Sequence, residues 1–242
     1  MQRMKTEGRI RHIGFSFHDT AEALEEILKN QPEMEFVQLQ INYYDWESEN
    51  VQSRKCYEVA KKYGVPVIVM EPVKGGTLAN MTGRPAEILK ELSPEASFAS
   101  YAIRYAASLE NVMLVLSGMS DEQQLIDNTA YMREFRPLDE RERAAIARVV
   151  EELAAMPTIA CTKCRYCVEG CPKKIPNPDV IEEYNMTVQF GINETNHGSY
   201  RQHTADGGSA DVCIRCGKCE GQCPQHLPIR DLLVKVAETF AE

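Results

Sequence analysis

The sequence predicts an α/β fold, with parallel βα units in residues 1–156 and a smaller domain of helices and loops in residues 157–242. Two observations lead to this prediction. Strand-like and helix-like segments alternate along the first part, which is typical of parallel sheets. Of the nine cysteines, all but one lie between Cys161 and Cys223, so the second part has a different character.

The composition is that of a soluble globular protein, with 43% hydrophobic and 26% charged residues in a chain of 242. The net charge of −9 disfavours binding to nucleic acids or anionic membranes, because phosphate groups repel an acidic chain. No apolar run approaches the ~20 residues of a membrane helix, and the charged residues 1–11 do not form a secretory signal. We therefore expect a cytoplasmic protein with neither nucleic acid nor membrane as partner.

The first 156 residues contain four strand–helix units. Strands are expected at residues 10–16, 36–41, 65–70 and 112–116. Apolar periodicity, helix caps and turn residues predict helices at residues 21–29, 51–63, 85–92, 94–108, 121–132 and 139–155. A full (β/α)8 barrel needs ~250 residues, so four units make half of one. The alternative, an open doubly wound sheet, usually has an early phosphate-binding loop, and the sequence contains neither Gly-x-Gly-x-x-Gly nor a Walker loop.

The cysteine-rich part contains an internal repeat at an offset of 52 residues. The run C-x2-C-x2-C-x3-C-P occupies residues 161–172 and again 213–224. After each run a proline and an aspartate recur, so each half is expected to be a cysteine loop followed by a helix. Residues 191–211, between the halves, are rich in Gly, Asn, Ser and His, and predict a long surface loop or a mobile insertion.

This spacing is the bacterial ferredoxin signature, in which three thiolates of one run wrap one [4Fe–4S] cluster and the fourth binds the other cluster. The expected ligands of the first cluster are Cys161, Cys164, Cys167 and Cys223, and those of the second are Cys213, Cys216, Cys219 and Cys171. The alternatives are zinc sites, which usually use paired C-x2-C elements, and disulfides, which normally accompany a signal peptide. Cys56 stands alone and is expected to be a small buried hydrophobe.

Four motifs in order resemble the fifth to eighth strands of an aldo/keto reductase barrel. They are Ile-Gly-x-Ser at residues 13–16, Gln-x-x-Tyr at 40–43, VIVMEPVKGG at 67–76, and Leu-Ser-Gly at 116–118 followed by Asn128. The whole chain resembles a subgroup in which such a barrel carries a two-cluster ferredoxin-like domain at its C-terminal end. The resemblance implies a partial (β/α)8 TIM barrel of about four βα units, strands 5–8.

The resemblance also implies a redox cofactor at the C-terminal ends of the strands, NAD(P) or a flavin in the intact barrel. Ser16 and Gln40 would hold the nicotinamide carboxamide. The loop from Gly118 would meet the phosphate or ribose end, and Asp127 and Asn128 the adenine edge.

The family's catalytic Asp, Tyr, Lys and His belong to its first four strands, which have no counterpart here. The resemblance therefore implies no catalytic residue in this chain and no carbonyl-reductase activity when it is alone. A tyrosine needs a neighbour such as lysine to act as a general acid near neutral pH. Lys74 is the nearest candidate for Tyr43, but packing or surface roles are expected for both residues.

A half-barrel leaves two open strand edges and an apolar inner face. We therefore expect self-association or pairing with a missing N-terminal half-barrel. Residues 1–5 have the character of the end of a preceding helix, which favours truncation.

Two functions fit these observations. The first is an oxidoreductase of the aldo/keto reductase family, whose clusters relay electrons between a ferredoxin-like or other redox partner and a barrel-bound cofactor, with a small-molecule substrate in the intact parent. The second is a non-enzymatic iron–sulfur electron-transfer module on a scaffold half-barrel.

Overall fold

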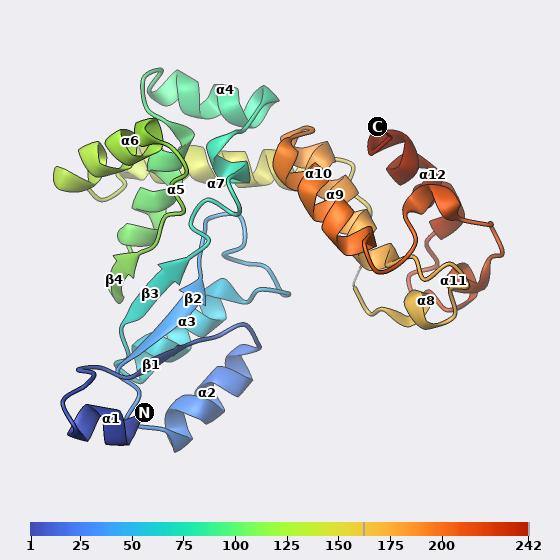
Figure 1. Cartoon of the computed structure of the whole chain (residues 1–242). Helices are drawn as coiled ribbons and strands as arrows, with labels where there is room; N and C mark the ends of the chain where they lie inside the picture. The colour runs from blue at the N-terminus through green and yellow to red at the C-terminus, as the bar shows by residue number, and fades with distance from the viewer. Residues whose placement is uncertain (162, 242) are drawn as a thin grey trace. The chain divides into compact units, whose positions relative to one another are not determined.

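The computed structural model describes residues 1–161 and 163–241. The chain divides into two compact units, Met1–Glu152 and Leu153–Glu242 (Figure 1). The division falls within the long helix α7 (Glu140–Ala155).

A parallel sheet forms the centre of the N-terminal unit. Within the described residues it has four strands, in the order β1 (Gly14–Ser16), β2 (Phe36–Gln40), β3 (Val67–Met70) and β4 (Val112–Val115). Phe15 pairs with Val37, and Val37 with Val67, whereas β3 and β4 pair with a register shift at Val67/Ile68. Parallel strands that follow the chain order, with helices between them, confirm the predicted partial α/β barrel.

Helices connect the strands, much as the apolar periodicity predicts. Besides α7 they are α1 (Gln2–Thr6), α2 (Ala21–Asn30), α3 (Ser53–Lys62), η1 (Thr77–Ala79), α4 (Gly83–Leu92), α5 (Phe98–Ala107) and α6 (Glu122–Arg133). Thr20, Ser97 and Asp121 cap α2, α5 and α6, because each side-chain oxygen accepts a hydrogen bond from a backbone N–H of the first turn.

The two faces of the sheet have different surroundings. Val37, Leu39, Val67 and Val69 are buried in a core that also contains residues of α2, α3 and α5. The alternate positions of β2 and β3 point to the opposite face, as the period of a strand requires, and are only partly buried.

Apolar side chains are exposed around the outer strand β4. Leu114 in β4 is 45% exposed and Leu116 just after it 42%. In α6, Leu125 and Ile126 are also exposed. Within the described residues, apolar side chains are thus exposed at this outer strand and at α6.

The C-terminal unit repeats its backbone at the offset found in the sequence. Its helices are α8 (Tyr166–Glu169), α9 (Asn177–Phe190), α10 (Glu194–Thr204), η2 (Ala210–Val212), α11 (Lys218–Gly221) and α12 (Ile229–Thr239). The bounds of α8 shifted by 52 residues are those of α11, and the start of α9 becomes that of α12. The left-handed residues Lys163, Arg165 and Lys174 recur as Arg215, Gly217 and His226.

Residues 191–211 are not a long loop, so that prediction was wrong. Asn193 and Asn196 form a capping box at the start of α10, in which each side chain accepts a hydrogen bond from the other's backbone N–H at 3.0 Å. Further along, the Tyr200 ring stacks on that of Phe240, with 4.3 Å between centroids. Local capping and this aromatic contact stabilise a helix that has few apolar residues.

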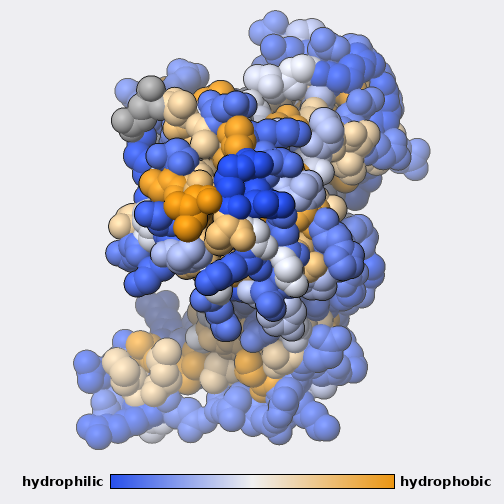
Figure 2. Space-filling view, turned by 90° about the vertical axis from the view of Figure 1, so that its right-hand side faces the viewer, coloured by the Kyte–Doolittle hydropathy of each residue, from blue (hydrophilic) through white to orange (hydrophobic). Residues whose placement is uncertain are grey.

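The surface is largely hydrophilic on the face shown in Figure 2, where hydrophobic residues form small separate patches. In the C-terminal unit, Tyr166, Ile192 and Ile214 are exposed. Across the described residues, every helix is too short or too polar to span a membrane.

Candidate functional site

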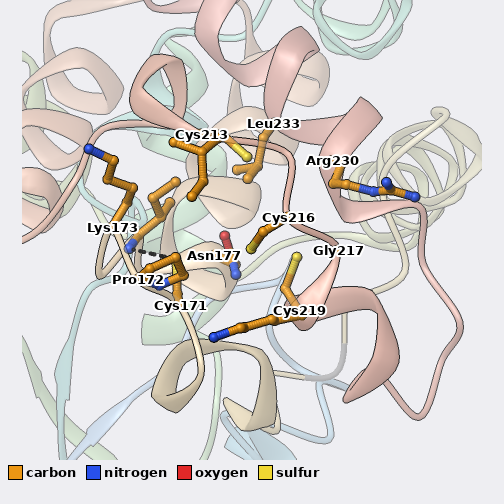
Figure 3. A pocket seen from close by; sticks show the side chains of 13 residues that line it. Cys171, Pro172, Lys173, Asn177, Cys213, Cys216, Gly217, Cys219, Arg230 and Leu233 are labelled. Atoms are coloured by element: carbon orange, nitrogen blue, oxygen red, sulfur yellow. Dashed lines mark hydrogen bonds between the residues drawn. The ribbon is translucent and has the colours of Figure 1, made fainter.

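The thiols of the two cysteine runs surround two separate hollows. The first cysteine site is the hollow lined by Cys161, Cys164, Cys167 and Cys223. The second cysteine site is the hollow lined by Cys171, Cys213, Cys216 and Cys219 (Figure 3). Counting the space that is open to solvent, each has about 330 Å³ free of protein atoms. Each site thus combines three cysteines of one run with the fourth of the other, as crossed ligation requires.

The local backbone explains this grouping. Gly217 and its counterpart Arg165 adopt left-handed backbone angles directly before α11 and α8, so the chain turns sharply inside each run. The Ile175 N–H donates to Cys171 Sγ at 3.4 Å, a bond drawn in Figure 3. Hydrogen bonds to the sulfurs are among the features that set the potential of a bound cluster.

An ion pair fixes each cysteine loop to the helix that follows it. Arg165 Nη1 lies 2.9 Å from Asp179 Oδ1, in the first turn of α9. Arg215 Nη2 lies 2.6 Å from Asp231 Oδ1, in the first turn of α12. The aspartates repeat at the sequence offset, and each also places negative charge at a helix N-terminus, where the helix dipole favours it.

Burial dominates the electrostatics of the thiols. It raises the pKa of Cys161 and Cys167, and it raises the pKa of Cys219 to about 11. At Cys167 a hydrogen bond from Asn177 opposes this effect. A metal group bound here must therefore displace protons, because the thiolate is the ligand.

The donor set fits two iron–sulfur clusters. All donors that the two runs bring to the hollows are thiols, which select soft metals and Fe–S clusters. In the described part of the chain, no three Cys, His, Asp or Glu side chains are grouped closely enough to hold a metal ion by themselves. The sulfurs of each set instead surround a hollow.

At the carboxyl end of β1, the structure brings Ser16 to Gln38, the middle residue of β2. Gln38 Nε2 donates to Ser16 Oγ at 3.2 Å and lies 3.3 Å from Met70 Sδ. Ser16 and Gln38 are opposite each other in the β1–β2 register. Sequence reasoning missed Gln38, because Gln38 and Gln40 point to the same face of β2 and only the register shows which one meets Ser16.

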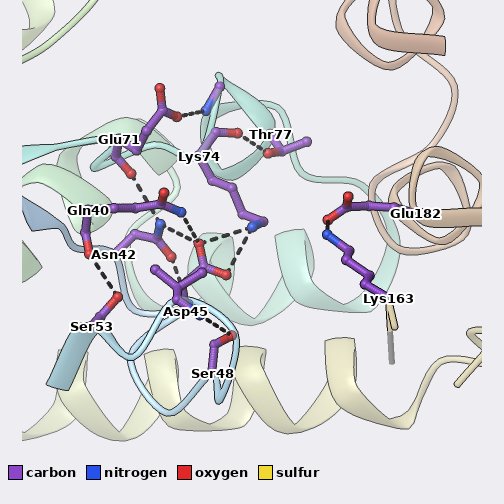
Figure 4. Close-up of polar contacts among 12 residues, drawn as sticks. Gln40, Asn42, Asp45, Ser48, Ser53, Glu71, Lys74, Thr77, Lys163 and Glu182 are labelled. Carbon is purple, nitrogen blue, oxygen red and sulfur yellow. Dashed lines mark hydrogen bonds and ion pairs between the residues drawn. The ribbon is translucent and has the colours of Figure 1, made fainter. Parts of the chain in front are cut away.

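Gln40 belongs to a different group, the buried network around Asp45 (Figure 4). Asp45 is 3% exposed and accepts hydrogen bonds from Gln40 Nε2 at 3.0 Å and Asn42 Nδ2 at 2.9 Å. Lys74 Nζ lies 2.9 Å from Asp45 Oδ1. Lys74 comes from the loop after β3, so this network joins the loops that follow β2 and β3.

The residues expected at the adenine end have partners inside the unit. Asp127 Oδ2 accepts from the hydroxyl of Ser97, the cap of α5, at 2.6 Å. Asn128 Nδ2 donates to Ser117 Oγ at 3.0 Å, and its Oδ1 accepts from the Tyr131 hydroxyl. At Gly118, a Cβ would meet no atom within 4 Å, so the backbone after β4 is open to solvent.

Tyr43 and Lys74 do not form an acid–base pair. The Tyr43 hydroxyl is buried and donates to Met81 Sδ at 3.6 Å, and this burial raises the pKa of Tyr43. The Lys74 ammonium is held by Asp45 and lies 5.1 Å from the centre of the Tyr44 ring. Tyr43 is thus packed inside the unit, and Lys74 takes part in the network around Asp45.

Comparison with known proteins assigns the two units. Residues 1–151 match the model of the aldo/keto reductase family. The chain belongs to the aldo/keto reductase family. Residues 160–227 match the model of a 4Fe-4S dicluster domain. This family member thus carries a dicluster domain after a partial reductase barrel.

Among the solved structures that it resembles are two aldo-keto reductases. One from Bacillus halodurans is 23% identical in both forms. The match with its holo form covers 61% of this chain and 53% of the reductase chain, with a TM-score of 0.49. For the apo form the two coverages are 61% and 54%, and the TM-score is 0.48. The enzyme from Klebsiella pneumoniae in complex with NADPH is 16% identical and covers 62% and 51%, with 0.49. The chain spans about half the length of these proteins. No curated protein matches the sequence.

Proposed function

We propose that this chain relays single electrons through two [4Fe–4S] clusters to or from a redox cofactor held at the carboxyl ends of strands β1–β3. The observation that carries the proposal is the grouping of the thiols, three from one run with the fourth from the other, around each of two hollows. The clusters, when bound, supply one-electron transfer.

The protein's own residues bind and insulate these clusters. Cys161, Cys164, Cys167 and Cys223 hold the first, and Cys171, Cys213, Cys216 and Cys219 hold the second. The buried residues Ile175, Ile229 and Leu233 pack around the sites and limit water access. Such a shell tunes a potential by excluding solvent.

Ser16, the last residue of β1, and Gln38, opposite it in β2, are the groups that meet the planar ring of the cofactor, NAD(P) or a flavin. Their hydroxyl and amide already share a hydrogen bond and present both donors and acceptors. The open backbone at Gly118 gives room for a phosphate or ribose. Asp127 and Asn128 position this segment through Ser97 and Ser117 rather than by direct contact with the cofactor.

The isolated chain does not reduce carbonyl compounds. Tyr43 and Lys74 are its nearest candidates for an acid–base pair. The Tyr43 hydroxyl instead donates to Met81, and the Lys74 ammonium pairs with Asp45. The exposed apolar residues at β4 and α6 contact a second half-barrel, either another copy or an N-terminal half. A ferredoxin-like partner exchanges electrons with the clusters. The substrate is a small molecule bound by the completed barrel.

The test is anaerobic isolation followed by iron and sulfide analysis, and by spectrophotometric assay of aldehyde reduction with NADPH. We expect two four-iron clusters and no aldehyde reduction. Zinc in place of iron would refute the clusters, and robust reduction by the pure chain would refute the missing catalysis. If the clusters can be reduced, the chain binds neither NAD(P) nor a flavin, and cluster reduction is the same in Ser16→Ala as in the wild type, the chain is a plain electron carrier.

A further inference from the structure

The side-chain amide of Asn177 contacts both cysteine sites. Asn177 is the first residue of α9 and is 1% exposed. It lines the second cysteine site, and Figure 3 shows its amide among the side chains of Cys213, Cys216 and Cys219. Its Nδ2 donates to the backbone carbonyl of Cys167, which belongs to the first site, at 3.3 Å.

The two ends of this amide differ in charge and surroundings. The N–H end donates to the Cys167 carbonyl, so the positive end of the amide dipole lies at the first cysteine site. The Oδ1 end is buried and has no hydrogen-bond partner in the described part of the chain. Buried side-chain oxygens nearly always have a partner, so this oxygen at a hollow of thiols requires an explanation.

The equivalent position in the second half of the repeat carries no amide. At the offset of 52 residues Asn177 corresponds to Ile229, which begins α12, is 1% exposed and lines the first cysteine site. The isoleucine side chain presents neither a donor nor an acceptor. At this buried position the two halves of the repeat therefore differ in polarity.

We propose that Asn177 shifts the reduction potentials of the two clusters in opposite directions, raising that of the first and lowering that of the second. This inference rests on the proposed function. Reduction adds one electron from the donor, and thus one negative charge, to a cluster. The charges and dipoles around a cluster are among the determinants of its potential. The positive N–H end of the Asn177 amide lies at the first site and stabilises the added charge there, whereas the carbonyl oxygen disfavours it at the second.

Surface cations act on the same potentials but do not replace this effect. Lys173 and Lys218 line the second site and are exposed, so solvent and salt screen their charges. A buried dipole is screened much less. Comparing variants at position 177 leaves these cations unchanged and isolates the contribution of the amide.

The test is a reductive titration of the full, anaerobically loaded chain, monitored by EPR, as wild type and as Asn177→Leu, which has a similar size. We expect the potential of the first cluster to fall and that of the second to rise. Cys216→Ser alters a ligand of the second site alone and assigns the signals. Ile229→Leu, at the equivalent position of the second half, is the control and should leave both potentials unchanged.

Unchanged potentials, or potentials that move in the same direction, would overturn the proposal, because a general gain in solvent access moves both alike. If Asn177→Leu loads poorly, unmodified protein labelled with ¹⁵N-asparagine provides a second readout. Among the described residues that line the two hollows, Asn177 is the one asparagine; it lines the second hollow and is hydrogen-bonded to Cys167 of the first site. Pulsed EPR should detect its nitrogen at the reduced first cluster, and no coupling would overturn the proposal. Iron and sulfide analysis of the unmodified chain shows separately whether the clusters exist.

Discussion

Glu35 joins the start of the chain to the sheet through several donors. Its carboxylate accepts from Lys5 Nζ at 2.5 Å and from the Ile13 N–H at 2.9 Å, and His12 Nδ1 lies at 3.2 Å. The hydrogen bond from Lys5 is the largest of the effects that lower the pKa of Glu35 to about 2. Since the folded-state pKa is depressed, this contribution to stability is present above the ordinary carboxyl pKa, about 4.5, and is lost as pH falls toward 2.

We predict that Glu35→Gln removes this part of the pH dependence. Urea unfolding between pH 6 and pH 2, followed by circular dichroism, should show a flatter loss of stability in the variant than in the wild type. Glu26→Gln, at an exposed position of α2, is the matched control and should retain the wild-type slope. Parallel curves for Glu35→Gln and the wild type would contradict the account.

Substitution of Asp45 is expected to lower the free energy of unfolding because its hydrogen-bond partners are shielded from solvent. Asp45→Ala leaves the Lys74 ammonium, whose side chain is 19% exposed, and two amides without their acceptor. We expect it to lower the free energy of unfolding by about 3 kcal/mol, measured by chemical denaturation. Glu47→Ala, which breaks the exposed pair with Arg54, should have a much smaller effect. Equal effects of the two variants would count against the network.

At the scale of elements, apolar periodicity and the internal repeat predicted helices and strands, but the sequence did not predict the register between strands. The segments 36–41 and 65–70 became β2 and β3, because their apolar residues alternate or run continuously. The offset of 52 residues predicted the equivalent helices of the C-terminal unit. The partner of Ser16 depends on the β1–β2 register, which the apolar pattern of the two strands does not determine. α10 was missed because its stability comes from an Asn193–Asn196 capping box and one aromatic contact rather than from an apolar stripe.

The capping box gives a prediction for α10. Asn193→Ala removes the side-chain acceptor for the Asn196 N–H and should lower the stability of the C-terminal unit by about 1 kcal/mol. Hydrogen exchange of the α10 amides measures this locally. Thr195→Ala, at an exposed position of the same turn, is the control. Unchanged protection in Asn193→Ala would show that the cap does not stabilise the helix.

At the scale of the whole molecule, each unit has its own core. The core of the C-terminal unit contains Cys167, and Cys171, Cys213, Cys219 and Cys223 pack against it. The N-terminal core is formed by the sheet, α2, α3 and α5. Metal binding that organises a core supplies folding free energy. We therefore predict that removing the clusters unfolds residues 153–242 and leaves residues 1–152 folded.

Limited proteolysis of the loaded and the chelator-treated full chain checks this prediction. After treatment, cleavage should concentrate beyond residue 152, and a fragment that retains the sheet should persist. Simultaneous digestion of both units, or resistance of the C-terminal unit without its clusters, would contradict the separation of the two cores.

The central claim is that the eight thiols of the two runs hold two [4Fe–4S] clusters by crossed ligation. Mössbauer spectroscopy of the ⁵⁷Fe-loaded chain, combined with iron and acid-labile sulfide counts, tests it most directly in the wild type and in Cys171→Ser. We predict two four-iron clusters in the wild type, and in the variant the perturbation of one cluster only, the one held by residues 213–219. Zinc without sulfide in the wild type, or a Cys171→Ser variant that disturbs the cluster of its own run, would contradict the account.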